Sequence, residues 1–233
     1  MNDNKAKEIV DKIFKEIFGE DNPYSIDDIR DKFAFDIRIP IEVRDTTTNE
    51  ITYTSCINAK SFIKNENMEK RDATEGWMIP KVQVKNLQDI LNIWNSINYT
   101  TTERIYDSDN VFGSDPIYRS NNVYRSTDCG DSSNLIFCDG IQQSSYVIAS
   151  QRSVNLNYCL RVDDSNTCTN SYNVICSAKI SNSLFIQDCS NLYECIFCSH
   201  ISNKEYCIAN MQFSEEEYFY LKGEIIKWIL SSN

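Results

Sequence analysis

The chain has 233 residues, of which 41% are hydrophobic and 24% are charged, and its formal net charge is -11. These proportions are typical of a folded globular protein, and the length allows one domain or two small ones. The negative charge disfavours binding to nucleic acid or to an anionic membrane, because the basic residues are scattered and form no patch.

The N-terminal segment MNDNKAKEIVDKIF has no apolar leader and no small-residue cleavage site, so it gives no indication of export. No apolar run approaches the length of a membrane span. We therefore expect a cytoplasmic protein, or a virion component assembled in the cytoplasm, whose thiols stay reduced. Nine of the ten cysteines lie at or after Cys129, so the two halves of the chain differ in composition.

Helical patterns open the chain, within a small N-terminal α+β domain that we expect over residues 1–105. Apolar residues recur at helical spacing over 3–18, with charged residues between them, and Gly19 is placed to end this helix. Ser25 followed closely by two acids is typical of a helix N-cap, which predicts a second helix near 26–32.

A β-hairpin is expected next, because apolar and polar residues alternate over 36–44 and 50–57 around a Thr- and Asn-rich turn. Pro40 indicates that the first strand lies at a sheet edge. A short apolar segment follows at 77–80, and the spacing of apolar residues over 87–94 predicts a further helix. No Gly-rich phosphate loop, nucleophile motif or histidine occurs here, so the domain is interpreted as a core-forming unit or as an attachment module.

Residues 106–213 are predicted to form a β-solenoid, a stack of short coils, because their sequence repeats. The motif Ile-Phe-Cys at 136–138 recurs at 196–198. One equivalent position recurs at separations of 22, 21, 18 and 21 residues, which indicates a period near 20 and about five coils. Its members are Tyr124, Tyr146, Thr167, Phe185 and Tyr206. Because one coil cannot bury its inward face alone, neighbouring coils must supply the core and the backbone hydrogen bonds.

A C-terminal capping helix is expected over residues 214–233. Ser214 and Glu217 form a capping box, and an apolar stripe follows them. The stripe consists of Tyr218, Leu221, Ile225, Trp228 and Ile229. We expect this helix to cover the last coil and the N-terminal domain to cover the first, because an open solenoid end exposes apolar core and unpaired strand edge.

The coils lead into the segment YCIANMQFSEEEY at residues 206–218. This junction resembles that of uncharacterised bacterial and phage proteins whose cysteine-rich β-solenoid repeats end in the same pattern. The resemblance covers roughly the last half of the chain. It implies the solenoid architecture, and it implies no activity.

The last coils hold the best candidate for a metal site. Four thiolates could bind zinc in a tetrahedral arrangement. The residues are Cys189, Cys195, Cys198 and Cys207, with His200 nearby. The alternative is that cysteine serves as a small buried residue at repeat positions, and the single C-x-x-C motif without a second pair favours it. In this interpretation Cys138, Cys159, Cys176 and Cys198 are equivalent to one another, as are Cys168 and Cys189.

Three further sets of polar residues have both a functional and a simpler interpretation. His200 could act as a general base, although a histidine in a turn position matched by Gly140 is more often solvated. Asp107, Asp109 and Asn110 resemble a calcium loop weakly, since their spacing does not fit an EF-hand, and a solvated loop is the simpler interpretation. Charged residues could also line one face of the solenoid as a site, or simply face water. They are Arg152, Arg161, Asp163, Asp164 and Asp188.

Two functional hypotheses from different classes follow. The favoured one is a non-enzymatic structural or protein-binding component of a larger assembly, such as a phage particle, which joins a protein partner or further copies of itself. It rests on the lack of a catalytic set of residues and on a repeat whose regularity serves packing. The alternative is an enzyme or ligand-binding protein with a site on the solenoid face. Zinc at the C-terminal cysteines is then the one cofactor expected, and no catalytic or other cofactor-binding residue is assigned.

Overall fold

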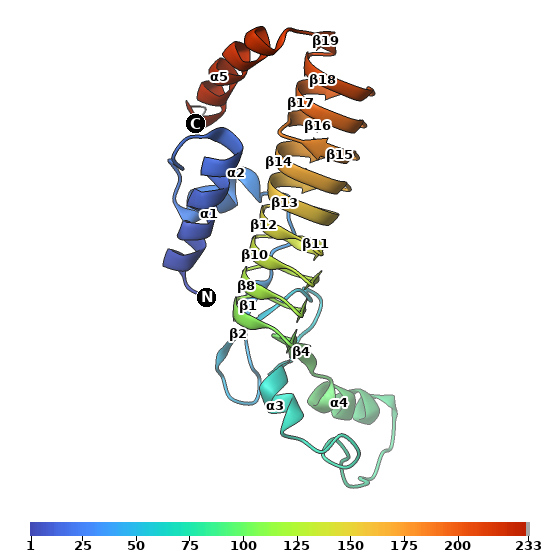
Figure 1. The fold of residues 1–233 in the computed structure, drawn as a ribbon. Helices are drawn as coiled ribbons and strands as arrows, with labels where there is room; N and C mark the ends of the chain where they lie inside the picture. Colours follow the sequence, from blue (N-terminus) through green and yellow to red (C-terminus); the bar gives the residue numbers. More distant parts are fainter. Residues whose placement is uncertain (232–233) are drawn as a thin grey trace.

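The computed structural model describes residues 1–231, which form a β-solenoid with helices beside it and a small mixed unit at one end (Figure 1). The solenoid makes about nine turns between residues 105 and 208. A small, largely helical N-terminal part precedes it and a C-terminal helix follows it, so the expected order of the three parts is confirmed. None of the helices in residues 1–231 has the length and the apolar character needed to cross a membrane.

Each coil of the solenoid is twelve residues long. Parallel strands pair each residue with the one twelve positions ahead, as in Leu135 with Val147 and Val147 with Cys159. The predicted period near 20 and the predicted number of five coils are therefore wrong. Of the five positions aligned from the sequence, only Tyr146 and Tyr206 are equivalent, because they alone are separated by a whole number of coils.

Within a coil the backbone follows a three-residue rule. From Arg119 to Ala209 every third residue has a left-handed conformation, with φ between 44° and 67°. Through the central coils, the residue after each of these corners points into the solenoid, as Ser120 does after Arg119. Twelve residues thus make four short sides joined at four corners. Because only Gly140 among these corner residues is a glycine, stacking of the coils must offset roughly 1–2 kcal/mol for each of the others.

The interior of the solenoid is narrow and holds small and medium-sized side chains. Its apolar members include Ile117, Val123, Leu135, Val147 and Leu156, each at most 1% exposed. Serines and cysteines occupy most of the other inward positions, and their polar atoms bond to the backbone. The hydroxyl of Ser126 donates to the carbonyl of Tyr124 and accepts the N–H of Cys138, both at 3.0 Å. Buried hydroxyls of this kind are tolerated because both of their hydrogen bonds are made.

The strands of the solenoid are mostly short, and consecutive coils pair in parallel. One further strand, β19 (Met211–Gln212), pairs antiparallel to β18 and closes the edge of the last coil. The other strands are β5 (Ile105–Tyr106), β6 (Asp109–Phe112), β7 (Ile117–Tyr118), β8 (Asn121–Tyr124), β9 (Cys129–Gly130), β10 (Ser133–Ile136), β11 (Asp139–Gln142), β12 (Ser145–Ile148), β13 (Gln151–Asp163), β14 (Asn166–Ile175), β15 (Ala178–Ser181), β16 (Leu184–Gln187), β17 (Ser190–Ser199) and β18 (Ser202–Ile208).

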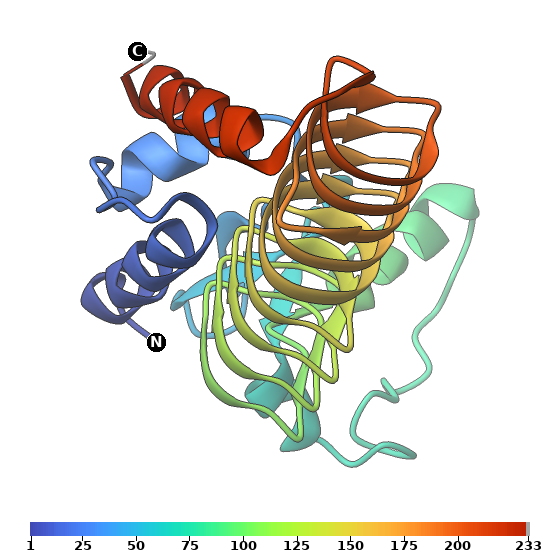
Figure 2. The same cartoon turned by 45° about the horizontal axis from the view of Figure 1, so that its top comes forward.

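Helices α1 (Asp3–Phe18), α2 (Ile26–Phe33) and α5 (Glu215–Ser231) lie along one side of the solenoid (Figures 1 and 2). The first two confirm the helices expected from the sequence. The apolar face of α1 packs on this side, where the ring centres of Phe18 and Tyr172 are 5.6 Å apart. The expectation that the whole N-terminal domain covers the end of the solenoid is therefore wrong for α1 and α2. Together with α5 they cover instead a row of large outward residues: Ile136, Ile148, Leu160, Tyr172, Leu184 and Ile196.

The C-terminal helix α5 folds back from the last coil and runs along the same side (Figure 2). Ser214 and Glu217 form the expected capping box, with 2.7 Å between the hydroxyl and the carboxylate. Under the helix, Lys222 Nζ lies 2.6 Å from Glu194 Oε2, and both side chains are at most 15% exposed. Thus α5 lies beside the last coils, and the end of the stack itself is closed by β19.

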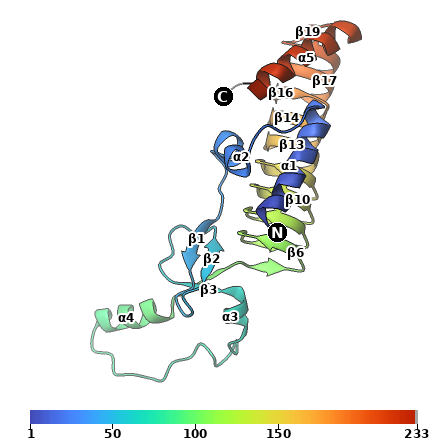
Figure 3. The same ribbon diagram turned by 90° about the vertical axis from the view of Figure 1, so that its left-hand side faces the viewer.

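Residues 41–104 form the mixed unit at the first coil (Figure 3). The expected hairpin is confirmed, with strands shorter than predicted, and the short apolar segment at 77–80 lies in neither a helix nor a strand. Arg104 joins the unit to the solenoid through two bonds to the buried carboxylate of Asp115, at 2.9 and 3.1 Å. The elements are β1 (Ile41–Arg44), β2 (Ile51–Thr54), β3 (Phe62–Lys64), α3 (Asn65–Glu69), α4 (Leu87–Ile97) and β4 (Thr100–Thr102), which pairs with β3.

Candidate functional site

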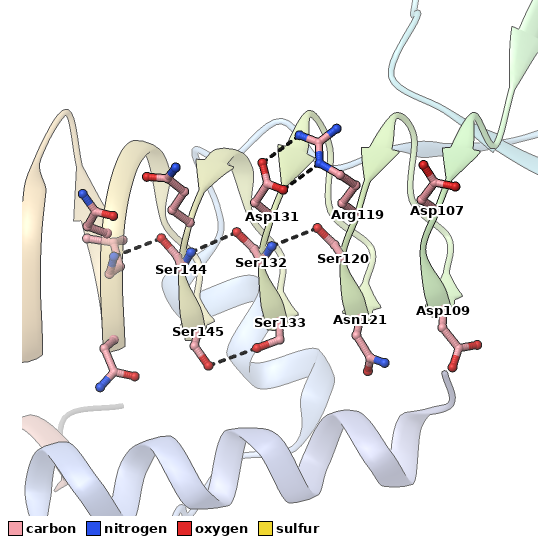
Figure 4. A pocket seen from close by; sticks show the side chains of 14 residues that line it. Asp107, Asp109, Arg119, Ser120, Asn121, Asp131, Ser132, Ser133, Ser144 and Ser145 are labelled. Carbon is pink, nitrogen blue, oxygen red and sulfur yellow. Dashed lines mark hydrogen bonds and ion pairs between the residues drawn. The ribbon is translucent and has the colours of Figure 1, made fainter.

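A polar groove with a volume of about 870 Å³ runs along the solenoid between residues 107 and 157. Two rows of outward side chains form its walls (Figure 4). The corner row stands on left-handed corners and consists of Asp107, Arg119, Asp131, Gln143 and Asn155. The side row, two residues further along each coil, consists of Asp109, Asn121, Ser133, Ser145 and Asn157.

The floor of the groove consists of inward residues, Ser120, Ser132, Ser144 and Leu156. The hydroxyl of Ser132 donates to the carbonyl of Gly130 at 2.7 Å and accepts the N–H of Ser144 at 3.0 Å. The floor hydroxyls are therefore engaged with the backbone. Contacts to a ligand would have to come from the two walls.

The charged groups of the groove are three carboxylates and one guanidinium. Arg119 donates from Nε and Nη2 to the two carboxylate oxygens of Asp131, each at 2.7 Å. These hydrogen bonds stabilise the ionised carboxylate and so lower the pKa of Asp131. With Arg119 neutralised in this pair, Asp107 and Asp109 leave the groove with a net negative charge. The groove therefore suits a neutral or cationic ligand.

Two residues of the predicted calcium loop, Asp107 and Asp109, lie at one end of this groove, but the three residues do not converge on one point. Asp107 belongs to the corner row and Asp109 to the side row, and their side chains point to opposite walls (Figure 4). The amide of Asn110 donates to Asn122 in the next coil. Within residues 1–231 no three His, Cys, Asp or Glu side chains are grouped to hold a metal ion. The segment is a coil of the solenoid, so the expected loop is not present.

The four cysteines of the predicted zinc site lie inside the last coils, and each donates its S–H to a carbonyl two residues earlier. Cys189 bonds to Gln187 at 3.2 Å, and Cys198 bonds to Ile196 at 3.4 Å. Burial raises the pKa of Cys189 and of Cys207, which opposes formation of the thiolate that zinc needs, whereas a hydrogen bond with Cys195 lowers the pKa of Cys198 to about 7. The zinc site thus stays a prediction, and the hydrogen bonds describe a packing role.

The predicted equivalence of the cysteines is only partly correct. Cys138 and Cys198 are five coils apart and share one inward position, but Cys159 lies on another side and Cys176 points outward. Cys168 and Cys189 also lie on different sides of the coil. Eight of the ten cysteines are nevertheless buried, and all ten are free. Cysteine and serine therefore alternate as small inward residues at several positions.

His200 occupies a corner that matches Gly140 five coils earlier, as predicted. Its Nδ1 is 2.5 Å from the hydroxyl of Ser199, and its Nε2 is 3.7 Å from the carboxylate of Asp188. These are the residue types of a hydrolytic triad, but the histidine side chain is 74% exposed. Acyl transfer needs a sheltered site with oxyanion donors, so we assign no catalysis here.

The charged residues predicted to share one face lie on two sides of the solenoid. Arg152 bonds to Asp163 at 2.6 Å and to Asp164 at 2.9 Å, along the outward corner row that also holds Asp188. Arg161 lies on the side covered by α2 and holds Asp36 at 2.9 Å. This bond lowers the pKa of Asp36, because the guanidinium stabilises the carboxylate. These charges thus fasten the structure and do not form a common site.

No family model matches this chain, and neither a curated protein nor a solved structure matches it. The function must therefore be argued from the chemistry of the surfaces. Sequence reasoning missed the groove, although it noted two of its residues. The sequence does contain the twelve-residue repeat that forms the groove, because serine recurs every twelve residues at Ser108, Ser120, Ser132 and Ser144.

Proposed function

We propose that this protein is a non-enzymatic structural component that associates with a second copy of itself through one end of a rigid solenoid. A stretch of exposed apolar residues in the mixed unit carries this proposal. We call it the apolar end surface, and it consists of Met78, Ile79, Val82, Val84, Leu87, Ile90, Leu91 and Trp94. Apolar patches that extend over several neighbouring side chains commonly mark protein interfaces.

A comparison of α4 with α1 shows that this exposure is unusual within the molecule. Both helices are amphipathic, and the seven apolar side chains that α1 buries are at most 6% exposed. In α4, by contrast, Leu87 is 68%, Ile90 51% and Trp94 52% exposed, and the helix buries no residue. Since burial of one such side chain contributes roughly 1.5–3 kcal/mol, covering this face would release several times that amount.

A second copy of the chain is the occupant that this surface fits. Leu87, Ile90, Leu91 and Trp94 follow the i, i+3, i+4, i+7 spacing, which forms a seam that packs well against a copy of itself. Helix α4 lies beyond the first coil, away from the solenoid and the side helices (Figures 1 and 3). Two copies can meet there while the rest of each chain, whose total net charge is -11, stays apart.

The charges around α4 also favour an antiparallel pair. Lys81 and Lys85 precede the helix, and its last turn has no basic residue. In a two-fold arrangement the lysines of one copy lie near the C-terminal carbonyls of the other α4, which carry partial negative charge. The same contact occurs twice, once in each direction.

Sedimentation velocity tests the proposal. At concentrations on the order of 10 µM, we expect the wild-type protein to sediment as a species with twice the 27.0 kDa mass of one chain. The double variant Leu91→Glu, Trp94→Glu should be monomeric, because it places two carboxylates in the seam. Both side chains are exposed, so the fold should remain intact.

The matched control is Gln88→Glu, Asn92→Glu, which adds the same two charges to α4 at exposed positions outside the seam. This variant should remain dimeric. A monomeric wild-type protein up to about 100 µM, or a dimer that survives the seam substitutions, overturns the proposal.

A further inference from the structure

We propose that the polar groove between the corner row and the side row binds a neutral oligosaccharide in an extended conformation. This inference concerns another face of the molecule and does not rest on self-association. Its basis is the shape, the hydrogen-bonding chemistry and the charge of the groove.

The groove presents hydrogen-bonding groups at regular intervals along a straight path. Neighbouring coils are about 4.7–4.9 Å apart, so the four steps from Asp107 to Asn155 span roughly 19 Å. The amides of Gln143, Asn155, Asn121 and Asn157 each offer both donors and acceptors. Sugar hydroxyls also donate and accept along the whole length of a chain, so an extended glycan can pair with successive coils.

The charge of the groove selects against anionic chains. Arg119 is its only basic residue, and both of its bonds to Asp131 are already made at 2.7 Å. Asp107 and Asp109 add negative charge at one end. A uronic-acid polymer or a nucleic acid would meet repulsion, whereas neutral hydroxyls can donate to these carboxylates.

An extended peptide fits the same groove less well. Peptides that bind to sheets usually pair with a free strand edge and place alternate side chains in pockets. Here the wall strands after the first coil already have partners on both sides, since Ser133 pairs with Asn121 and with Ser145, whereas β6 at the first coil pairs with β8 alone. The walls are polar throughout and offer no apolar pocket for a side chain.

Titration of three neutral tetrasaccharides, N-acetylchitotetraose, cellotetraose and maltotetraose, into the full chain by NMR tests the proposal. We expect at least one of them to bind with a dissociation constant on the order of 1 mM or lower. The variant Gln143→Gly, Asn155→Gly should weaken that binding at least about tenfold, a change of 1.4 kcal/mol. Glycine suits these left-handed corners, where φ is 49° and 57°, so the backbone is not strained.

The matched control is Asn191→Gly, Asn203→Gly, at the same corner position in later coils outside the groove. It should leave binding unchanged, as should the monomeric α4 variant. The proposal is overturned if none of the three sugars binds, if the groove and control variants bind alike, or if tetragalacturonate or a cationic polar peptide binds more tightly than every neutral sugar.

Discussion

The hydroxyl of Ser120 accepts the backbone N–H of Ser132, one coil further on, at 3.1 Å, and donates to the carbonyl of Tyr118 at 2.7 Å. The same pair of bonds recurs between Ser132 and Ser144. Serine side chains thus serve as part of the backbone hydrogen-bond network inside a solenoid too narrow for large residues. Each hydroxyl links its own coil to the next.

Removal of one such hydroxyl should be costly. Ser126→Ala leaves the N–H of Cys138 without its acceptor in the interior, where Ser126 is fully buried, and removes one of the two hydrogen bonds to the carbonyl of Tyr124, which still accepts the N–H of Phe137. We expect a loss of about 1–3 kcal/mol in the free energy of unfolding, measured by urea denaturation. The control Ser133→Ala, on the half-buried side row, should change it by less than about 0.5 kcal/mol. Equal effects of the two substitutions would contradict the role of the inward hydroxyls.

Glycine should be tolerated at the corners and not beside them. Lys179 is an exposed corner residue with φ 58°, so Lys179→Gly removes a left-handed penalty of roughly 1–2 kcal/mol at the cost of roughly 0.5–1 kcal/mol of backbone entropy. We expect an unchanged or slightly raised melting temperature. Ala178→Gly, one residue earlier in a paired strand, should instead lower it. A larger fall in melting temperature for Lys179→Gly than for Ala178→Gly would show that residue 179 is not a left-handed corner.

Local signals predicted much of the fold correctly. Helices α1 and α2, the hairpin and the capping box of α5 depend on caps and spacing within a few residues of one another. The period of the solenoid was missed for a physical reason. Inward residues occur every third position, so they do not alternate as in an ordinary strand, and small serines and cysteines replace one another there.

The two surfaces could be predicted only in part. The helix at α4 was expected from its apolar spacing, but α1 has the same kind of pattern and is buried, so the pattern does not reveal which helix stays exposed. In the groove, Asp107 and Asp109 were noticed because carboxylates suggest a metal. Asn121 and Asn155 have the appearance of ordinary turn residues until the twelve-residue coil places them in the two walls of one groove.

Asp45 should make the mixed unit sensitive to acid. Its carboxylate accepts hydrogen bonds from the N–H of Thr47 at 2.7 Å, the N–H of Lys64 at 2.8 Å and the amide of Asn67 at 3.0 Å. Burial alone would raise the pKa of Asp45, but these bonds favour the ionised form more strongly and lower it. Its stabilising contribution is therefore complete above the unfolded pKa near 4 and is lost as the pH falls towards the lowered folded value.

The variant Asp45→Asn should lower the free energy of unfolding at pH 7 by roughly 1–3 kcal/mol and should flatten its decline below about pH 4. Urea denaturation at pH 7, 4 and 3 measures both effects. Asp21→Asn, at a side chain that is 98% exposed, is the control and should leave the pH profile unchanged. An Asp45→Asn profile parallel to that of the wild type at all three pH values would contradict the prediction.

The number of reactive thiols tests the twelve-residue coil most directly. Cys56 and Cys176 are exposed, and the other eight cysteines are buried, with burial raising the pKa of Cys138 to about 12. We predict that a thiol reagent modifies two cysteines in the native protein and all ten after denaturation, and that peptide mapping finds the two at Cys56 and Cys176. Rapid native labelling of Cys138 or Cys198, or protection of Cys176, would contradict the inward and outward positions that the twelve-residue coil assigns to these cysteines.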